Sequence, residues 1–349
     1  MQKFLAFLAV ACLSSASIAV TPAASGSAPR DTAAAAATPE GEQAARAVLE
    51  ALGAVVRVKV RAIADARSLR TLGREREGSG IVLASSGMVL TIGYLILEAE
   101  SIELTDVNGK TVTGSIAAYD HASGFGLVRP TVPLAVAGAT LGTSKDVAES
   151  ERLIFATHGG KENASLATVA SKRRFAGYWE YLIDDAIFTV PPRGDHSGAA
   201  LINREGKLVG IGSLIVADAA VPNRRSPGNM FVPIDLVKPI ISGIAANGRA
   251  SETQRPWIGL STQEVEGRLF VIRVQEDSPA AAAGLKTGDI ILAIGGEKVA
   301  SLEEFYARLW SAGRPGTSIR LNVLQGANMR EVDVKSIDRL QYMRARPSL

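Results

Sequence analysis

The feature that most constrains this fold is a regular succession of short apolar segments and turn residues between about residues 55 and 232. At its start, Val56, Val58 and Val60 alternate with basic side chains, which is the period of a half-buried strand. Further along, similar apolar segments flank turns such as Asn108–Gly109. Strands and turns that follow one another over roughly 170 residues predict an antiparallel sandwich or barrel.

A second unit follows the first. A helix is predicted over Ile234–Ala246 and ends the first module, which we place at residues 43–248. Polar residues 249–256 predict a linker, and residues 257–340 then show short strands with one helix, which begins after the N-cap residue Ser301. Two domains fit a chain of 349 residues.

The two ends of the chain are predicted to lie outside these domains. Lys3, an apolar run over residues 4–13 and small residues at positions 17 and 19 predict a secretory signal peptide over residues 1–19. Two alternatives are an uncleaved anchor and a lipid-modified Cys12. Residues 20–42, rich in alanine and proline, predict a tether, and residues 341–349 a C-terminal tail. We expect an exported chain with no integral membrane segment after cleavage.

Composition excludes several classes of function. The net charge is +3 and the basic runs are short, so no nucleic-acid partner is predicted. Cys12 is the single cysteine, which excludes an internal disulfide. No spacing of histidines and carboxylates predicts a metal site, and no glycine-rich loop predicts a phosphate site. We therefore expect no cofactor and no metal.

Four stretches, in this order, resemble the HtrA family of exported serine proteases. They are Gly78–Thr91, Asp120–Arg129, Asp195–Ile211 and Trp257–Gly296. Together the resemblance covers about residues 43–337. It implies a mainly β chain, in which a trypsin-like double β-barrel is followed by a small α+β PDZ domain, and it implies a periplasmic or cell-envelope location.

The chain departs from the family's catalytic pattern. Ser197 matches the nucleophile, but Tyr94 stands at the histidine position and Gly124 at the aspartate position. A phenol with a pKa near 10 is a poor base at neutral pH. Asp195 replaces a glycine whose amide helps to form the oxyanion hole, and its carboxylate is expected to add negative charge there. These departures predict a pseudoprotease.

Two other interpretations remain open. One is an active serine endopeptidase in which Ser197 uses a recruited base. The available histidines are His121, His158 and His196, and we expect each of them to be a surface or loop residue. Ser197 would then be a turn serine. The other is a scaffold whose barrel serves assembly alone, since family members commonly form trimers through the barrel.

The PDZ-like unit retains its expected binding residues. PDZ domains bind an extended peptide as an added strand beside a helix. The resemblance implies a carboxylate-binding loop and a groove helix, although core packing is the alternative for the two helix residues. The residues are Trp257, Ile258, Gly259, Leu260, Phe305 and Leu309. The implied partners are peptides or unfolded proteins with free C-termini, with a homotrimer or a partner protease as further partners.

An aromatic cluster over residues 178–181 completes the set of candidates. Related proteases carry loops used for activation or subunit contact in this region, and core packing is the alternative.

Overall fold

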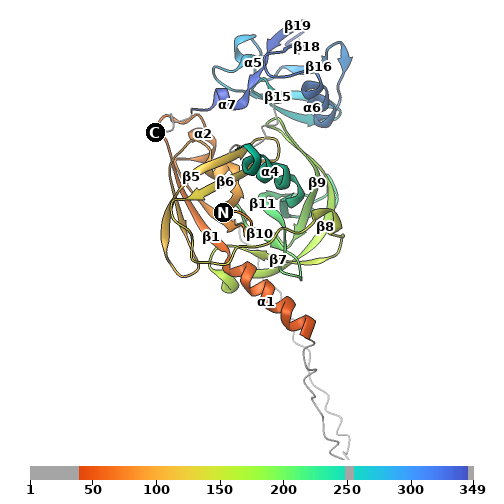
Figure 1. The fold of residues 1–349 in the computed structure, drawn as a ribbon. Coiled ribbons are helices and arrows are strands. Elements are labelled where there is room, and N and C mark those ends of the chain that lie inside the picture. Colours follow the sequence, from red (N-terminus) through yellow and green to blue (C-terminus); the bar gives the residue numbers. More distant parts are fainter. Residues whose placement is uncertain (1–38, 248–254, 345–349) are drawn as a thin grey trace, which may run out of the picture. The chain divides into compact units, whose positions relative to one another are not determined.

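A computed structural model describes residues 39–247 and 255–344 (Figure 1). The expected signal peptide, most of the tether, most of the linker and the end of the tail lie outside the described residues. Helix α1 (Pro39–Gly53) begins within the stretch expected to be tether. Pro39 suits the first turn of a helix, and Glu40 and Glu42 complement the positive end of its dipole.

The first six strands close into a barrel in the order β1-β2-β3-β6-β5-β4. Their bounds are β1 (Val55–Ala62), β2 (Glu75–Val82), β3 (Val89–Ile92), β4 (Ala99–Thr105), β5 (Thr111–Asp120) and β6 (Phe125–Pro130). The alternating residues Val56, Val58 and Val60 of β1 point into the barrel and are buried. Two short helices, α2 (Leu69–Leu72) and α3 (Gly93–Ile96), interrupt the strands.

A second closed barrel follows, in the order β10-β11-β12-β9-β8-β7. Its strands are β7 (Arg152–Ala156), β8 (Ala164–Gly177), β9 (Tyr181–Val190), β10 (Ala200–Ile202), β11 (Leu208–Val216) and β12 (Gly228–Pro233). Strands β8 and β9 form a long hairpin whose tip is residues 177–181. The chain then forms helix α4 (Lys238–Asn247). The predicted barrel architecture is confirmed, as two barrels.

The C-terminal unit has its own sheet and its own core. The sheet order is β14-β15-β16-β18-β19, and helix α6 packs on a buried cluster that contains Leu260, Phe305 and Leu309. The Ser301 hydroxyl accepts the Glu304 N–H at 3.1 Å, which caps α6. The elements are β13 (Pro256–Trp257), β14 (Leu260–Val265), β15 (Arg268–Val274), α5 (Pro279–Ala282), β16 (Ile290–Ile294), β17 (Glu297–Lys298), α6 (Leu302–Ser311), β18 (Ser318–Gln325), β19 (Asn328–Lys335), β20 (Ile337–Asp338) and α7 (Arg339–Tyr342).

Among residues 39–247 and 255–344, no helix is long and apolar enough to cross a membrane.

Candidate functional site

The loop that carries Ser197 is joined directly to the first barrel. The Ser79 N–H of β2 donates to the Ser197 carbonyl at 2.8 Å, and the Gly198 N–H donates to the Gly212 carbonyl of β11 at 2.9 Å. Gly198 has φ +73°, and a Cβ there would lie 1.9 Å from the Ser79 carbonyl oxygen. A Cβ on Gly78 would lie 2.5 Å from the Ser197 carbonyl oxygen. The close approach of the two barrels therefore requires glycine on both sides.

Tyr94, on α3, contacts the Ser197 hydroxyl directly. Its Oη lies 2.8 Å from Ser197 Oγ and 2.9 Å from the Ser213 carbonyl oxygen. The phenol has a single proton for these two contacts, and the carbonyl can only accept. Burial raises the pKa of Tyr94 to about 12, so the phenol keeps its proton at neutral pH. The group at the position of the base is therefore a protonated phenol, which is a poor acceptor for the Ser197 proton.

The position that matches the catalytic aspartate is closed by another phenol. Gly124 has φ +80°, and a Cβ there would lie 3.0 Å from Tyr181 Oη. The Tyr181 hydroxyl donates to the Ser123 carbonyl at 2.7 Å, and the Gly124 carbonyl accepts the Gly93 N–H at 2.7 Å. Both the backbone conformation and the neighbouring ring therefore oppose a larger side chain at residue 124.

The Asp195 carboxylate carries no isolated charge, contrary to the sequence-based expectation. Arg193 donates two hydrogen bonds to it, at 2.9 and 2.5 Å, and the Thr157 hydroxyl donates a third at 3.0 Å. Burial alone would raise the pKa of Asp195, but these donors hold it below its ordinary value. The carboxylate is neutralised by a cation two residues earlier, which sequence reasoning could have identified.

Each of the three histidines has surroundings of its own. His121 lies in the turn after β5, where burial lowers its pKa to about 4. The His158 ring lies 3.3 Å from the Ser79 hydroxyl. Burial lowers the pKa of His196. In the part of the chain that the structure describes, none of the three rings hydrogen-bonds to Ser197 Oγ; that contact belongs to Tyr94.

The loop expected to bind a carboxylate holds one that comes from the same chain. The main-chain N–H groups of Ile258, Gly259 and Leu260 donate to the side chain of Glu180, at the tip of the β8–β9 hairpin. Sequence reasoning did not single out Glu180. The available signal was an acidic residue within an aromatic cluster.

The other predicted groove residues are buried. Phe305 and Leu309 are fully buried within the PDZ core, and Trp257 packs on Tyr342 with 4.6 Å between ring centroids. Tyr306, also fully buried, is the α6 residue whose hydroxyl contacts the hairpin. Sequence reasoning missed Tyr306.

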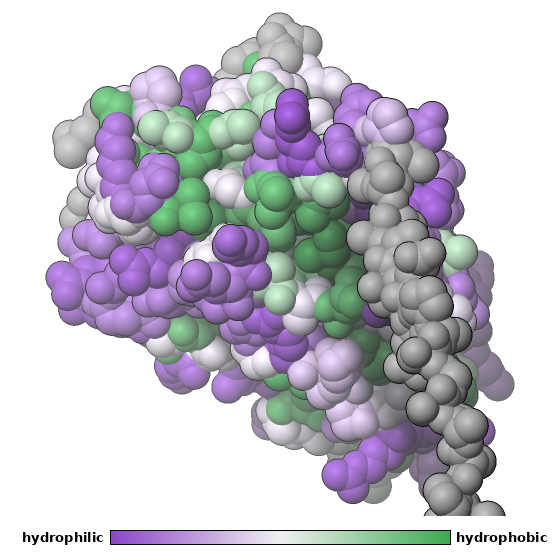
Figure 2. Space-filling model, turned by 90° about the horizontal axis from the view of Figure 1, so that it is seen from below, coloured by the Kyte–Doolittle hydropathy of each residue, from purple (hydrophilic) through white to green (hydrophobic). Residues whose placement is uncertain are grey.

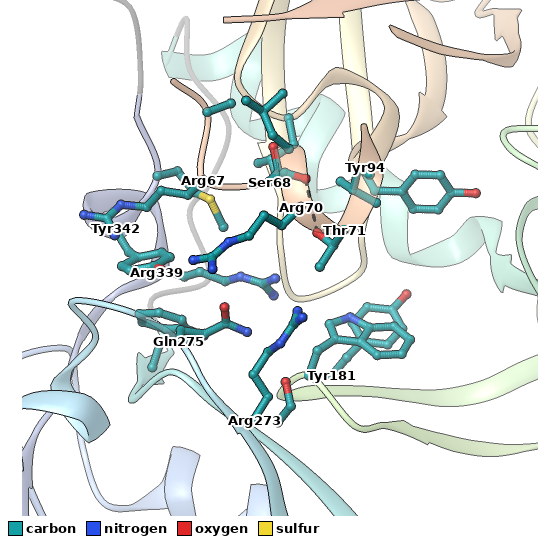
Figure 3. Close-up of a pocket in the computed structure, with 18 of the residues that line it drawn as sticks. Arg67, Ser68, Arg70, Thr71, Tyr94, Tyr181, Arg273, Gln275, Arg339 and Tyr342 are labelled. Carbon is teal, nitrogen blue, oxygen red and sulfur yellow. Dashed lines mark hydrogen bonds between the residues drawn. The ribbon is translucent and has the colours of Figure 1, made fainter. Parts of the chain in front are cut away.

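A cavity of about 670 Å³ extends from Tyr94 to the PDZ domain. Figure 3 shows that Arg70, Arg273 and Arg339 direct their guanidinium groups toward its interior. Arg70 pairs with Glu276 at 2.5 Å. In the described part of the chain, Arg339 Nε is buried and has no hydrogen-bond partner. Five arginines and three carboxylates line the cavity, and each carboxylate pairs with one arginine, so the net positive charge of the lining comes from Arg273 and Arg339.

Known families and curated proteins agree with this architecture. A trypsin-like peptidase domain family matches residues 78–211, and a PDZ domain family matches residues 256–336. A probable periplasmic serine endoprotease, DegP-like, from Pseudomonas fulva is 26% identical over 292 residues, which is 75% of this chain and 57% of that protein. The periplasmic pH-dependent serine endoprotease DegQ of Escherichia coli is 26% identical over 280 residues, or 74% and 58% of the two proteins. The chain thus spans little more than half the length of these relatives.

Solved structures show the same fold. The HtrA-type protease AlgW with a tripeptide aligns with a TM-score of 0.51 at 19% identity, over 87% of this chain and 98% of that one. A serine endoprotease from Yersinia pestis aligns with a TM-score of 0.51 at 22% identity, over 85% and 97% of the two chains. Two barrels, a PDZ domain and these similarities together show a trypsin-like peptidase domain joined to a PDZ domain, the arrangement in which the chain is similar to HtrA-type proteases.

Proposed function

We propose that this protein is an exported pseudoprotease that binds polypeptide ends or unfolded segments through its PDZ domain. The observation that carries the proposal is the contact between Tyr94 and Ser197, in which a buried phenol with a raised pKa lies 2.8 Å from the hydroxyl of the nucleophile position. A general base must accept the proton of the nucleophile, and a buried phenol that keeps its own proton at neutral pH is a poor acceptor.

The magnitude of this effect can be worked out from the pKa of Tyr94. With a pKa of about 12, roughly one phenol in 10⁵ is ionised at pH 7, whereas a histidine with an ordinary pKa near 6.5 is mostly in its basic form. The loss of available base is about 10⁵-fold, before the missing carboxylate is counted. Catalysis through Ser197 is therefore expected to fall to the background level.

The binding half of the proposal is supported by the loop at residues 258–260, whose N–H groups already hold a carboxylate. A peptide terminus presents the same chemical group. The relatives are named periplasmic, which supports export and a role in envelope protein quality control or in regulation of a partner protease. An exported chain should begin near Val20, which intact-mass analysis of envelope protein would test.

Assembly through the barrel domain is a further part of the proposal. Figure 2 shows hydrophobic areas bordered by hydrophilic residues on one face of the molecule. Contiguous apolar surface of this kind is typical of subunit interfaces. A homotrimer is expected in sedimentation velocity, and a monomer at micromolar concentration would contradict it.

A fluorophosphonate probe tests the loss of catalysis, with unfolded casein as a parallel substrate. We expect no labelling of Ser197 and no cleavage above that of Ser197→Ala. Rapid labelling at Ser197 together with casein cleavage would establish the rival interpretation, an active endopeptidase with a recruited base. For the binding half, peptides with a free apolar C-terminus should bind and their amidated forms should not.

A further inference from the structure

The tip of the β8–β9 hairpin lies in the groove between β14 and α6 of the PDZ domain. On the β14 side, the Thr262 N–H donates to the Tyr178 carbonyl at 2.8 Å. On the α6 side, the Tyr306 hydroxyl donates to the Gly177 carbonyl at 2.6 Å and accepts the Glu180 N–H at 3.1 Å. Both walls of the groove therefore bind the main chain of the hairpin.

The Glu180 side chain continues this contact into the carboxylate-binding loop. It accepts N–H groups of Ile258, Gly259 and Leu260 at 3.3, 2.8 and 2.9 Å, and the residue is only 4% exposed. Gly259 has φ +87°, and a Cβ there would lie 2.3 Å from Ser278 Cβ, so this loop conformation requires glycine. Three consecutive N–H groups directed at one carboxylate form a complete anion site.

The hairpin adopts an unusual backbone conformation where it enters the loop. Glu180 has φ +58°, which is uncommon for a residue other than glycine, asparagine or aspartate. Such a conformation persists where surrounding contacts determine it, as those to Tyr306 and to residues 258–260 do here. On either side of the tip, Ala176 and Leu182 pack against the PDZ core. The PDZ domain therefore contacts the main chain of the hairpin, the Glu180 carboxylate and the apolar residues on both sides of the tip.

We propose that the PDZ groove recognises an acidic β-hairpin tip, that residues 177–181 are its internal ligand, and that Glu180 takes the place of a terminal carboxylate. The ligand class is a hairpin with a glutamate at its tip, in addition to the chain ends of the proposed function. An external chain end and Glu180 would compete for the same three N–H groups. That competition rests on the proposed peptide binding, whereas occupancy by the hairpin does not.

The expected size of the effect follows from the fraction of open grooves. The apparent affinity for an external ligand is the intrinsic affinity multiplied by the fraction of molecules in which the groove is free. A tethered hairpin acts at an effective concentration of the order of millimolar, so this fraction is small in the intact chain. Glu180→Gln replaces one of the two acceptor oxygens by an NH2 group that cannot accept a main-chain N–H, and this loss should raise the fraction of open grooves at least tenfold.

The test compares the full-length wild-type protein with Glu180→Gln, and Glu103→Gln serves as a matched control because Glu103 is an exposed β4 residue. The first probe is a fluorescein-labelled, disulfide-cyclised peptide that copies residues 174–183. The second is a linear decapeptide with a free carboxylate after an apolar residue. Fluorescence anisotropy should show both probes binding Glu180→Gln at least tenfold more tightly than the wild type or the control.

The two probes separate the two proposals. Binding of the cyclic probe alone would support the hairpin ligand and contradict recognition of chain ends. Equal binding of the linear probe to the wild type and to Glu180→Gln would support chain-end recognition and overturn the internal ligand. Failure of the cyclic probe to bind Glu180→Gln would also overturn it.

A second variant and a measurement that needs no peptide keep the test valid if Glu180→Gln misfolds. Tyr306→Phe removes the hydroxyl that holds Gly177 and leaves the carboxylate loop untouched. Amide hydrogen exchange of residues 258–262 should rise in both variants and remain at the wild-type level in Glu103→Gln. Unchanged exchange in both folded variants would refute hairpin occupancy of the groove.

Discussion

Acid should destabilise this protein through His121, and the effect can be isolated by substitution. Burial lowers the pKa of His121 to about 4, with Arg339 and Arg255 acting in the same direction and Asp120 and Asp338 opposing them. In the described part of the chain, its Nε2 atom is buried without a hydrogen-bond partner. The folded protein therefore favours the neutral ring, whereas the unfolded chain takes up a proton near pH 6.5.

The sign and the magnitude follow from linkage. A depressed pKa contributes stability that is present above pH 6.5 and is lost as the pH falls through about 4. The free energy of unfolding falls by about 3 kcal/mol in all through His121, and about 2 kcal/mol of this is lost between pH 7 and pH 5. Glu180 acts in the opposite direction, because burial raises its pKa to about 7 and folding then favours its protonated form as the pH decreases. The wild-type profile contains both contributions.

Glu180 contributes equally to the free energy of unfolding of the wild type and of His121→Phe, so its contribution cancels when the two proteins are compared. Phenylalanine keeps a ring of similar shape and cannot titrate, so the variant should lose about 2 kcal/mol less than the wild type between pH 7 and pH 5. Urea unfolding at a series of pH values measures this, with His158→Gln as a control at a more exposed histidine. Parallel loss of stability in the wild type and His121→Phe would refute the reasoning.

Three further outcomes are expected. The combined change Tyr94→His, Gly124→Asp and Asp195→Gly should leave casein uncleaved. The backbone at residue 124 is left-handed, and a Cβ there would lie 3.0 Å from Tyr181 Oη, so the new aspartate is not accommodated. Measurable cleavage by this variant would contradict the expectation. In the wild type, the apparent Kd of the linear decapeptide should rise as the pH falls from 8 to 5, because the raised pKa of Glu180 means that acid favours the docked hairpin. In Glu180→Gln, the apparent Kd should not change over this pH range. Arg76→Met should lower the free energy of unfolding in urea by about 3 kcal/mol, since the buried guanidinium serves four acceptors, and a loss below 1 kcal/mol would contradict that role.

The two domains could be predicted from the sequence because their signals are local. The alternation at Val56–Val60 and the turns between strands depend on neighbouring residues, and the N-cap at Ser301 depends on residues within one helical turn. The departures at Tyr94 and Gly124 were also visible, because they stand at fixed distances from family motifs.

The contacts that decide the chemistry are not local. Glu180 accepts hydrogen bonds from main-chain N–H groups that are 78 to 80 residues away along the chain, and no sequence pattern around it indicates where the hairpin tip will lie. The aromatic cluster beside it supports the hairpin, since Trp179 stacks on Tyr181 at 5.4 Å, but aromatic residues alone do not identify the groove. The left-handed backbone of Gly124 likewise depends on the turn as a whole, whereas the pairing of Asp195 with Arg193 was within reach of sequence reasoning.

The close contact of Gly78 and Gly198 across the two barrels has a consequence for the history of such chains. Substitution of either glycine would force the barrels apart, whether or not Ser197 ever acylates, because a Cβ at residue 198 would lie 1.9 Å from a carbonyl oxygen. Selection for folding alone would then be sufficient to preserve the glycine-rich signature of a protease in a chain that has lost the chemistry, as the proposed function requires. The departures from the protease pattern lie outside this glycine contact, at the phenol of residue 94 and the glycine of residue 124.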